Sequence, residues 1–349
     1  MIILSNSLTR TADEGALNIA TSLIRRIRKA DPETTVVTYE RQAPESDLHL
    51  NLNKFLLNGD LIRLIRKKKA PVLYVPFPTR MLPMALRIFL LSRFARWGLR
   101  SLLVMNGELD PVSKVLLKLS RGQILTVSRQ SYERFAEVIG SRAVYLKTGV
   151  DRAKFVPVDA DRKRSLREKY GIPLDKKVVL HVGHLKAGRN AACLLTLDES
   201  WHSILVASTH APDSKDAALR QQFLEAPNAT LLESYLPDVQ ELYQLADVYL
   251  FPVVEAGNCI DVPLSALEAV SCGIPVAATP YGELRELLGK PGFYEIQSFE
   301  ALAELLTEAV EEKISGRENA AEYDWEITVN YLLSYINKTR KKTKKREAF

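Results

Sequence analysis

Short apolar runs alternate with amphipathic segments along the first half of the chain. Between the first two runs, residues 16–29 place apolar side chains on one face at helical spacing. Because strands that alternate with helices form parallel sheets covered on both faces, this half is predicted to be an α/β domain. The predicted strands are residues 2–4, 35–38, 72–75 and 101–105.

A second alternating set follows in the other half. Residues 151–175, between the two sets, are polar and charge-rich and are predicted to form a linker into a new domain. The predicted strands of this set are 177–182, 203–207, 229–232, 248–251 and 276–278, and its predicted helices are 239–246, 263–270 and 299–314. In doubly wound folds, ligands bind at the carboxyl ends of such strands.

The net charge of +6 is concentrated at the C-terminus. Residues 338–349 hold seven bases against one acid, which accounts for the whole excess, and this tail is predicted to be disordered. Three cysteines without metal-ligand spacing predict a reducing compartment, no disulfide framework and no metal site. The sequence has neither a basic lead-in to an apolar N-terminal run nor an apolar run of about 18 residues. A cytoplasmic location is therefore expected.

A polar loop and a helix follow the predicted strand at 248–251. The helix begins near Pro263 and Leu264, and the unpaired amides of such a helix start can hold a phosphate. Further along the helix, the Glu268 carboxylate can accept hydrogen bonds from the hydroxyls of a ribose. A plain helix cap with an exposed glutamate is the alternative.

Several segments, in order, resemble the group 1 glycosyltransferases of the GT-B fold. Residues 246–252 with 267–277 look like the donor-site signature of that family. Residues 13–16 are similar to its donor-facing glycine loop, and 126–128 with 147–157 are similar to its interdomain passage. Residues 182–189 are similar to its Gly-Arg-Leu … Lys segment. Residues 323–326 are similar to the start of its last helix, with Trp325 as the apolar anchor. The resemblance spans residues 13 to about 335.

The resemblance implies two Rossmann-like domains facing a cleft. They are an acceptor-binding domain at 1–155 and a nucleotide-sugar-binding domain at 156–325, followed at 326–349 by a helix that returns towards the first domain and by the basic tail. The expected reaction moves a hexosyl-type sugar from a nucleotide-diphosphate donor, UDP- or GDP-linked, with retention. Neither a metal nor another cofactor is expected.

Carried over residue by residue, the resemblance assigns roles to three charged or titratable side chains. Arg189 takes the family's lysine position and His184 its arginine position, both aimed at the diphosphate, which gains negative charge as the glycosidic bond breaks. Glu268 matches the ribose-binding second glutamate of the family's paired-glutamate motif. The residues expected to bind the donor are Gly15, Gly183, His184, Arg189, Asp261, Pro263, Leu264 and Glu268.

The chain departs from the family pattern at two places. The first glutamate of the paired motif is replaced by Ile260, so Asp261 or Glu255 is expected to reach the donor sugar instead. The histidine that many relatives place after the fourth strand is also missing. Asn106 or Glu108 is expected to line the reaction site there, with a simple turn as the alternative. The expected catalytic residues are Asn106, Glu108 and Asp261.

Residues 80–100 mix apolar bulk with five arginines and no acid. This pattern suits a helix that lies on an anionic membrane surface, and an ordinary helix packed on its own sheet is the alternative. Together with the basic tail, it favours a peripheral enzyme on the inner face of the membrane. The expected partners are a nucleotide-sugar donor and a glycan or lipid-linked acceptor of cell-surface polysaccharide or glycolipid biosynthesis, without specific nucleic acid.

Three other functions stay open at the level of sequence. A nucleotide-sugar 2-epimerase would need additional acid and base groups, which five histidines do not favour. A basic nucleic-acid-binding protein is permitted by the charge, but charge alone gives non-specific affinity, and no recognition motif is present. An inactive transferase-like scaffold is made possible by Ile260. The sugar, the nucleotide base, the acceptor, the linkage and the oligomeric state do not follow from the sequence.

Overall fold

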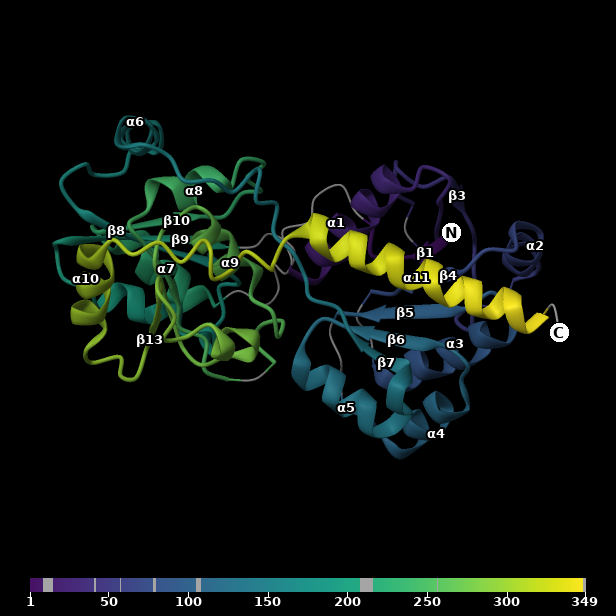
Figure 1. Ribbon diagram of the computed structural model, residues 1–349. Helices are drawn as coiled ribbons and strands as arrows, with labels where there is room; N and C mark the ends of the chain where they lie inside the picture. Colours follow the sequence, from purple (N-terminus) through teal and green to yellow (C-terminus); the bar gives the residue numbers. More distant parts are fainter. Residues whose placement is uncertain are drawn as a thin grey trace. The chain divides into compact units, whose positions relative to one another are not determined.

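The computed structural model divides the chain into two compact units. It describes residues 1–8, 15–40, 42–56, 58–77, 80–104, 108–207, 216–255 and 257–347, with side chains as far as residue 338. Unit 1 comprises Met1–Thr148 and Trp325–Phe349, and unit 2 comprises Gly149–Asp324. The chain therefore passes from one unit to the other twice, and the first passage lies a few residues before the predicted boundary at 155 (Figure 1).

Unit 1 is built on a parallel sheet of strand order β3-β2-β1-β4-β5-β6-β7. The order reverses between β1 and β4, because the chain winds first to one side of β1 and then to the other. The strands are β1 (Ile2–Ser5), β2 (Thr35–Thr38), β3 (Leu48–His49), β4 (Val72–Val75), β5 (Leu99–Leu103), β6 (Gln123–Thr126) and β7 (Ala143–Tyr145). The helices are α1 (Gly15–Ala30), α2 (Gly59–Lys68), α3 (Met81–Phe94), α4 (Pro111–Leu119), α5 (Arg129–Ile139) and α11 (Trp325–Glu347), with a 3-10 turn η1 (Gly140–Arg142).

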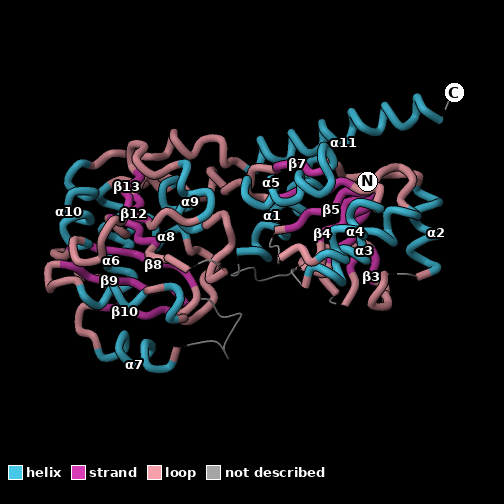
Figure 2. The backbone as a smooth tube through the Cα atoms, turned by 90° about the horizontal axis from the view of Figure 1, so that it is seen from below, coloured by secondary structure: helices cyan, strands magenta, loops and turns pink. Residues whose placement is uncertain are grey.

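Helices cover both faces of this sheet. α1 and α11 pack together on one face, and α3, α4 and α5 lie on the other (Figures 1 and 2). The predicted helical face of α1 is confirmed, since Leu17, Ala20, Leu23, Ile24 and Ile27 are all buried. On the opposite face, side chains of α3 and α5 form one apolar core with alternate residues of the strands. Such burial is the main stabilising contribution of the unit.

The last helix, α11, begins at Trp325, one residue before the predicted 326, and joins unit 1. Trp325 is buried, and the Arg26 guanidinium lies 5.7 Å from the centre of its ring. Thr328 Oγ1 donates to the Lys147 carbonyl oxygen at 2.9 Å. The prediction of a disordered basic tail is wrong, because the backbone stays helical to Glu347. A helix fixed by tertiary contacts in its first turns extends at little cost through lysine and arginine, which are good helix formers.

Unit 2 is a second parallel sheet, of strand order β10-β9-β8-β11-β12-β13, whose order reverses between β8 and β11. Its strands are β8 (Lys177–Gly183), β9 (Trp201–Ala207), β10 (Ala229–Leu232), β11 (Val248–Phe251), β12 (Val276–Ala278) and β13 (Phe293–Glu295). Its helices are α6 (Ala160–Tyr170), α7 (Ala217–Glu225), α8 (Gln240–Leu245), α9 (Leu264–Ser271) and α10 (Leu302–Glu312), with 3-10 turns η2 (Ala187–Arg189), η3 (Ala191–Thr196) and η5 (Gly282–Glu286). The predicted doubly wound α/β fold is confirmed, with the predicted strands displaced by two residues or fewer.

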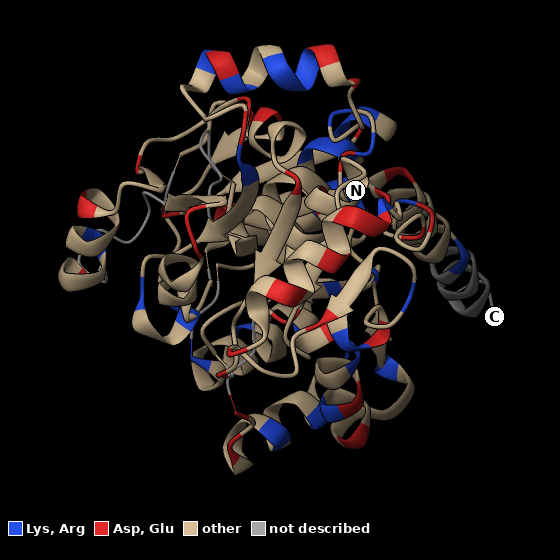
Figure 3. Ribbon diagram, turned by 90° about the vertical axis from the view of Figure 1, so that its left-hand side faces the viewer, with Lys and Arg blue, Asp and Glu red and all other residues tan. Residues whose placement is uncertain are grey.

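The prediction that residues 151–175 form a linker is wrong, because this segment contains the helix α6 and belongs to unit 2. Asp159 caps the helix by accepting from the Arg162 amide at 2.8 Å, and Gly171 ends it in a left-handed conformation. α6 is held to unit 2 mainly by charge: Lys163 and Arg167 both pair with Asp247, at 2.6 and 2.7 Å. Both signs of charge are visible along this helix at the top of Figure 3. The apolar periodicity was weak because ion pairs take the place of an apolar face.

Candidate functional site

The candidate site of unit 2 lies where the strand order reverses. β8 and β11 are neighbours in the sheet, and each ends at the same edge because the strands are parallel. The loop after β8 carries His184 and Arg189, and the loop after β11 leads through Asp261 to α9 and Glu268. In open α/β sheets, ligands bind in the crevice at this point of reversal. The sheet topology therefore brings together the predicted donor residues of unit 2.

Arg189 is buried at the end of η2, only 6% exposed. Its guanidinium hydrogen-bonds the Cys259 side chain, its Nε has no hydrogen-bond partner, and no carboxylate among the described residues pairs with it. Gly183 leaves the room for this arrangement, since a Cβ there would lie 3.2 Å from Arg189 Nη1. A buried cation without a counter-charge is costly, so the arrangement favours the binding of an anion.

His181, which the sequence reasoning did not single out, lies beneath Gly183. A Cβ on Gly183 would be 2.9 Å from His181 Nε2, and this nitrogen has no hydrogen-bond partner. His181 Nδ1 lies 2.8 Å from the Leu250 carbonyl oxygen, which joins β8 to β11. Burial, with the nearby Arg189, lowers the pKa of His181 to about 4, so the ring is neutral near pH 7. The signal in the sequence that could have identified His181 is a histidine inside an otherwise apolar strand.

Glu268 lies on α9 and is partly exposed. Its Oε2 accepts a hydrogen bond from the Tyr243 hydroxyl at 2.9 Å. Burial raises the pKa of Glu268 to about 7, and the hydrogen bond from Tyr243 only partly opposes that shift. A carboxyl group in this environment changes its charge near neutral pH, which is frequent at functional sites.

Tyr249 connects the three segments that carry these residues. Its hydroxyl lies 2.7 Å from Ser265 Oγ on α9 and 3.3 Å from the Val182 carbonyl oxygen on β8. The phenol is fully buried in β11, and burial raises its pKa, so it stays protonated. The ring thereby fixes the start of α9 against the end of β8. No pattern in the sequence indicated this role, because a tyrosine in an apolar strand is common in a core.

The N-terminus of α9 has no side-chain cap. Pro263 stands at the N-cap, no side chain there accepts from the first amides, and Leu264 is the first helical residue. Helix amides without an internal partner carry a partial positive charge and bind anions. This start lies within the same segment as Asp261 and Glu268, as predicted.

The loop from 252 to 263 positions the candidates for the donor sugar. Ile260 is buried, so an apolar side chain occupies the place of the family's first glutamate. Asp261 is partly buried, and its carbonyl oxygen accepts from the Glu283 amide at 2.8 Å. Glu255 is exposed and accepts from Asn258 Nδ2 at 3.2 Å. Asp261 and Glu255 therefore differ in burial, and their roles at the donor sugar stay predictions.

Gly282 is expected to be required for this loop. It has a φ of +51°, and a Cβ there would overlap the Asp261 carbonyl oxygen. We expect Gly282→Ala to lower the free energy of unfolding by about 2 kcal/mol, through backbone strain and the displacement of Asp261. Urea unfolding measures this.

Gly289→Ala is the matched control, because Gly289 has a φ of +77° but no atom within 4 Å of its Cβ position. This variant should lose only about 1 kcal/mol, from backbone strain. Equal losses in the two variants would contradict the argument from the Asp261 contact.

The remaining predicted residues belong to unit 1. Gly15 is the first residue of α1, and Glu108 is exposed shortly before α4. Asn106 lies outside the described residues, as do 13 and 14 of the predicted glycine loop. The roles of Gly15, Asn106 and Glu108 stay predictions.

Unit 1 has a polar network at its own point of strand reversal, which the sequence reasoning missed. Asn6, directly after β1, donates to Glu40 Oε2 at 2.7 Å and accepts from the Phe77 amide at 2.7 Å. Glu40 is exposed and has a φ of 60°, a conformation that is uncommon for residues other than glycine. Arg87 lies 3.8 Å from the same carboxylate. The network joins the ends of β1, β2 and β4 at the edge where ligands bind.

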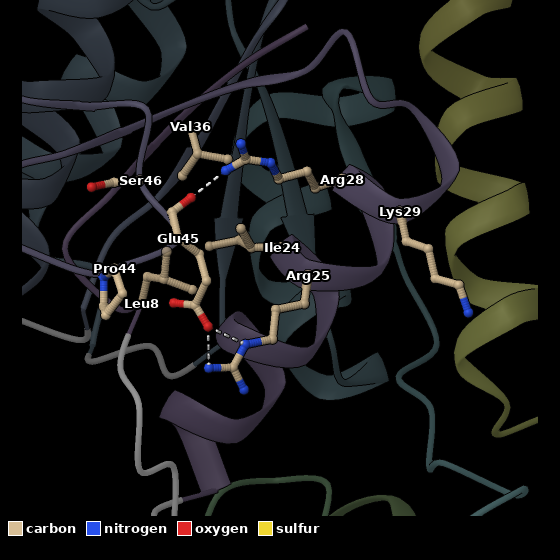
Figure 4. A pocket seen from close by; sticks show the side chains of 9 residues that line it. All are labelled: Leu8, Ile24, Arg25, Arg28, Lys29, Val36, Pro44, Glu45 and Ser46. Carbon is tan, nitrogen blue, oxygen red and sulfur yellow. Dashed lines mark hydrogen bonds and ion pairs between the residues drawn. The ribbon is translucent and has the colours of Figure 1, made fainter.

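A pocket of about 400 Å³ in unit 1 is a weaker candidate. Figure 4 shows Arg25 pointing towards Glu45, with a nitrogen–oxygen distance of 2.6 Å. Arg28 donates to the Glu45 carbonyl oxygen and pairs with Asp47 at 2.6 Å. These pairs largely neutralise the pocket's charge, and it lies beside the C-terminal part of α1 rather than at the strand reversal. We therefore assign it no ligand.

Two further properties concern the described ranges as a whole. No group of three His, Cys, Asp or Glu side chains in them could hold a metal ion. No helix in the same ranges is long and apolar enough to cross a membrane.

Comparison with known proteins matches residues 176–312 to the family model of glycosyl transferases group 1. One curated relative, named as a teichuronic acid biosynthesis glycosyltransferase, TuaC, of Bacillus subtilis, is 25% identical over 197 residues. That match covers 56% of this chain and 48% of the relative, so the chain spans about half the length of this protein. The matched family segment contains Gly183, Arg189 and Glu268, around which the site is built.

Solved structures match the whole chain at low sequence identity. A crystal structure of Anabaena HepE in complex with UDP has a TM-score of 0.75 at 16% identity and covers 97% of this chain and 99% of that chain. A glycosyltransferase from Rickettsia africae has a TM-score of 0.74 at 13% identity, with coverage of 97% and 98%. At such identities the likeness shows the fold, which is GT-B as predicted.

Proposed function

Because the chain belongs to the group 1 glycosyltransferase family, we propose that it transfers a hexosyl-type sugar from a nucleotide-diphosphate donor to a glycan or lipid-linked acceptor. Unit 2 would bind the donor and unit 1 the acceptor. The observation that carries the proposal is the buried Arg189, which no described carboxylate neutralises. The UDP complex of HepE, a protein of the same fold, is consistent with a nucleotide donor.

The diphosphate is proposed to lie between Arg189 and the open start of α9. A diphosphate supplies the counter-charge that Arg189 lacks, in a place where most water is excluded. The amides at Leu264 and Ser265 would add hydrogen bonds from the helix end. His184, partly exposed after Gly183, is proposed to contribute as a second group. Negative charge on the departing nucleotide would then meet fixed positive charge.

The ribose is proposed to bind to Glu268. Its carboxylate already accepts from Tyr243 and has further lone pairs for ribose hydroxyls. The sugar of the donor would contact Asp261 or Glu255, since Ile260 offers no polar atom. Transfer is proposed to proceed with retention by front-face displacement, which needs no strong general base, and with Arg189 and His184 rather than a metal neutralising the leaving group.

The acceptor is proposed to approach unit 1 at the Asn6–Glu40 network. Glu40 is exposed and held by Asn6, so its carboxylate can accept hydrogen bonds from sugar hydroxyls. The name of the relative TuaC, which refers to teichuronic acid biosynthesis, favours cell-surface polysaccharide or glycolipid formation. Association with an anionic membrane on its inner face is part of this proposal and rests on the basic tail and residues 80–100.

Calorimetric titration with UDP, GDP and ADP, each beside its monophosphate and in excess EDTA, tests the donor site. One diphosphate is expected to bind at least about tenfold more tightly than its monophosphate, because Arg189 and the start of α9 recognise the second phosphate. Equal affinity for mono- and diphosphate would remove Arg189 from its proposed role. Absence of binding by all three diphosphates would overturn the proposed function.

A further inference from the structure

The outer surface of α4 in unit 1 carries an apolar stripe. Val112, Val115 and Leu119 are 56%, 55% and 56% exposed. Their spacing of three and four residues places them on one side of the helix. Ser113 and Leu117 are buried and point to the core instead. An exposed stripe of large aliphatic side chains is costly in water and marks a surface that is covered in function.

The neighbouring helix α3 extends this apolar surface. α3 and α4 are in contact, and Met84, Ile88 and Leu91 form the buried face of α3. On its other side, Leu82 is 43% exposed, and Phe89 is partly exposed with the Arg93 guanidinium 4.5 Å from the centre of its ring. The further partly exposed apolar residues of α3 are Leu86, Leu90 and Phe94. Apart from Arg87 and Arg93, the side chains of α3 are apolar or small on its outer side as well as on its buried side, as in helices that pack against an apolar neighbour on both sides.

The rim of this surface is basic and poor in acids. Lys114, Lys118 and Arg121 are exposed along and after α4, and the sequence holds no acid from 111 to 132. Arg142 lies at the inner end of α4, where its guanidinium donates to the Leu117 and Ser120 carbonyl oxygens at 3.2 and 2.6 Å. These bonds fix the C-terminal end of the helix in unit 1, so the surface is rigid rather than a loose segment.

The five arginines of residues 80–100 do not all contribute to this surface. Arg87 donates to the Lys54 carbonyl oxygen at 2.9 Å, and Arg100 is buried in β5. Arg80, Arg93 and Arg96 are exposed. The membrane-binding pattern anticipated in 80–100 is thus only partly on the surface, and the most exposed apolar side chains of α3 and α4 are those of α4, which are flanked by lysines.

We infer that the outer face of α3 and α4 docks on an anionic lipid bilayer, with Val112, Val115 and Leu119 entering the interface. Two contributions stabilise binding of this kind. Aliphatic side chains are buried in the bilayer surface, and basic side chains are attracted to the lipid phosphates. The lysine rim has no acid beside it along α4 and complements anionic headgroups, so charge complementarity favours a bilayer as the occupant. The inference rests on the proposed function, because it gives unit 1 access to a lipid-linked acceptor.

Vesicle binding by the full chain tests the inference. Wild type is expected to sediment with phosphatidylglycerol–phosphatidylcholine vesicles and not with phosphatidylcholine alone. Val115→Ser with Leu119→Ser should weaken partitioning by about tenfold or more, since two exposed aliphatic side chains lose their burial in lipid. The matched control is Ile327→Ser with Tyr331→Ser, which removes two exposed apolar residues at the same spacing on α11. Equal weakening in both variants would overturn the assignment of the face.

Trp97 gives a second measurement. It is partly exposed after α3, whereas Trp201 and Trp325 are buried. Binding to vesicles is expected to shift its emission to shorter wavelength, and the α4 variant should lose that shift. Lys344→Gln, Lys345→Gln and Arg346→Gln together should reduce only the salt-sensitive part of binding and keep the shift. A shift that survives in the α4 variant and disappears in the tail variant would place docking on α11 and overturn the inference.

The two proposals fail separately. The α4 and α11 variants are expected to keep wild-type nucleotide affinity and thermal stability, because their substituted side chains are exposed and belong to unit 1. A chain that binds nucleotide but no anionic vesicle overturns the docking surface and leaves the transferase. A chain that binds vesicles but no nucleotide overturns the proposed transferase function and leaves the docking surface.

Discussion

Arg189→Met is expected to weaken the binding of the preferred nucleoside diphosphate about a hundredfold, which corresponds to about 2.7 kcal/mol. The guanidinium is buried, hydrogen-bonds Cys259 and is paired with no described carboxylate. A buried cation that meets a diphosphate forms charge-assisted bonds where water screens them little, and losing one such partner costs several kcal/mol. Affinity for the monophosphate should fall much less.

The same substitution is expected to stabilise the ligand-free protein. In the absence of an anion, a buried charge without a counter-charge opposes folding, and methionine fills a similar volume without charge. Thermal unfolding with and without diphosphate measures both effects: a higher unfolding temperature without ligand, and a smaller increase on adding it. Arg189→Lys keeps a cation, the residue type that the family has here, and should recover most of the affinity.

Arg220→Met is the matched control for Arg189. Arg220 is also in unit 2 but pairs with Glu233 at 2.8 Å on the surface. It should change neither the affinity nor the stability by more than a few tenths of a kcal/mol. If Arg189→Met kept wild-type affinity for the diphosphate, the anion site would have to lie elsewhere.

Glu268→Gln is expected to separate stability from function at the other end of the site. Burial raises the pKa of Glu268 from 4.5 to about 7, so the folded protein resists its ionisation while the unfolded chain does not. Glutamine has no charge to bury, and it keeps an oxygen for the Tyr243 hydroxyl. Above pH 7 the variant should therefore be more stable than wild type by about 3 kcal/mol.

The direction of the pH dependence follows from the raised pKa. Below pH 4.5 the carboxyl is neutral in both states, and its contribution to stability is fully present. Between pH 4.5 and 7 the unfolded chain ionises first, so the wild type loses stability as the pH rises through the folded pKa. Urea unfolding from pH 5 to 8 should show this slope in wild type and its loss in Glu268→Gln. Glu304→Gln, on the exposed side of α10, should leave the slope unchanged.

Nucleotide affinity should change in the opposite sense. If the ionised carboxylate accepts the ribose hydroxyls, wild-type affinity rises as the pH increases through 7, because Glu268 then loses its proton. Glu268→Gln should bind about tenfold more weakly at pH 8 and show no such rise. A variant that was destabilised at pH 8, or that bound nucleotide as well as wild type, would contradict the assignment of Glu268 as a carboxylate of raised pKa that meets the ribose.

Much of the fold was predictable because its signals are local. Apolar runs such as 248–251 and 276–278 coincide with β11 and β12, since strands of a parallel sheet are buried on both faces. The signals failed where tertiary contacts replace apolar periodicity. α6 is held by ion pairs to Asp247, and α11 continues into the basic tail because its first turns are fixed on unit 1.

The donor residues of unit 2 were predictable only as members of a sequence pattern. Arg189, Glu268 and the start of α9 were named from the resemblance, but their physical properties were not. That Arg189 is buried without a described carboxylate, and that the Glu268 carboxyl has its pKa near 7, depends on packing between segments far apart in the chain. His181 and Tyr249 were missed, because in the sequence each is only a polar group inside an apolar strand.

The sequence predicts most of the strands and their order, because apolar runs are local signals, but not β3, β6, β7, β13 or α6. It also determined the family-like segments and the excess of positive charge. Packing between distant segments sets which polar groups are removed from water, which arginines bond within the protein, and which apolar residues remain on the surface. Arg87 and Arg100 are used within unit 1, while Val115 and Leu119 are left on its surface. Burial depends on neighbours from distant parts of the chain, and spacing along the sequence does not encode them.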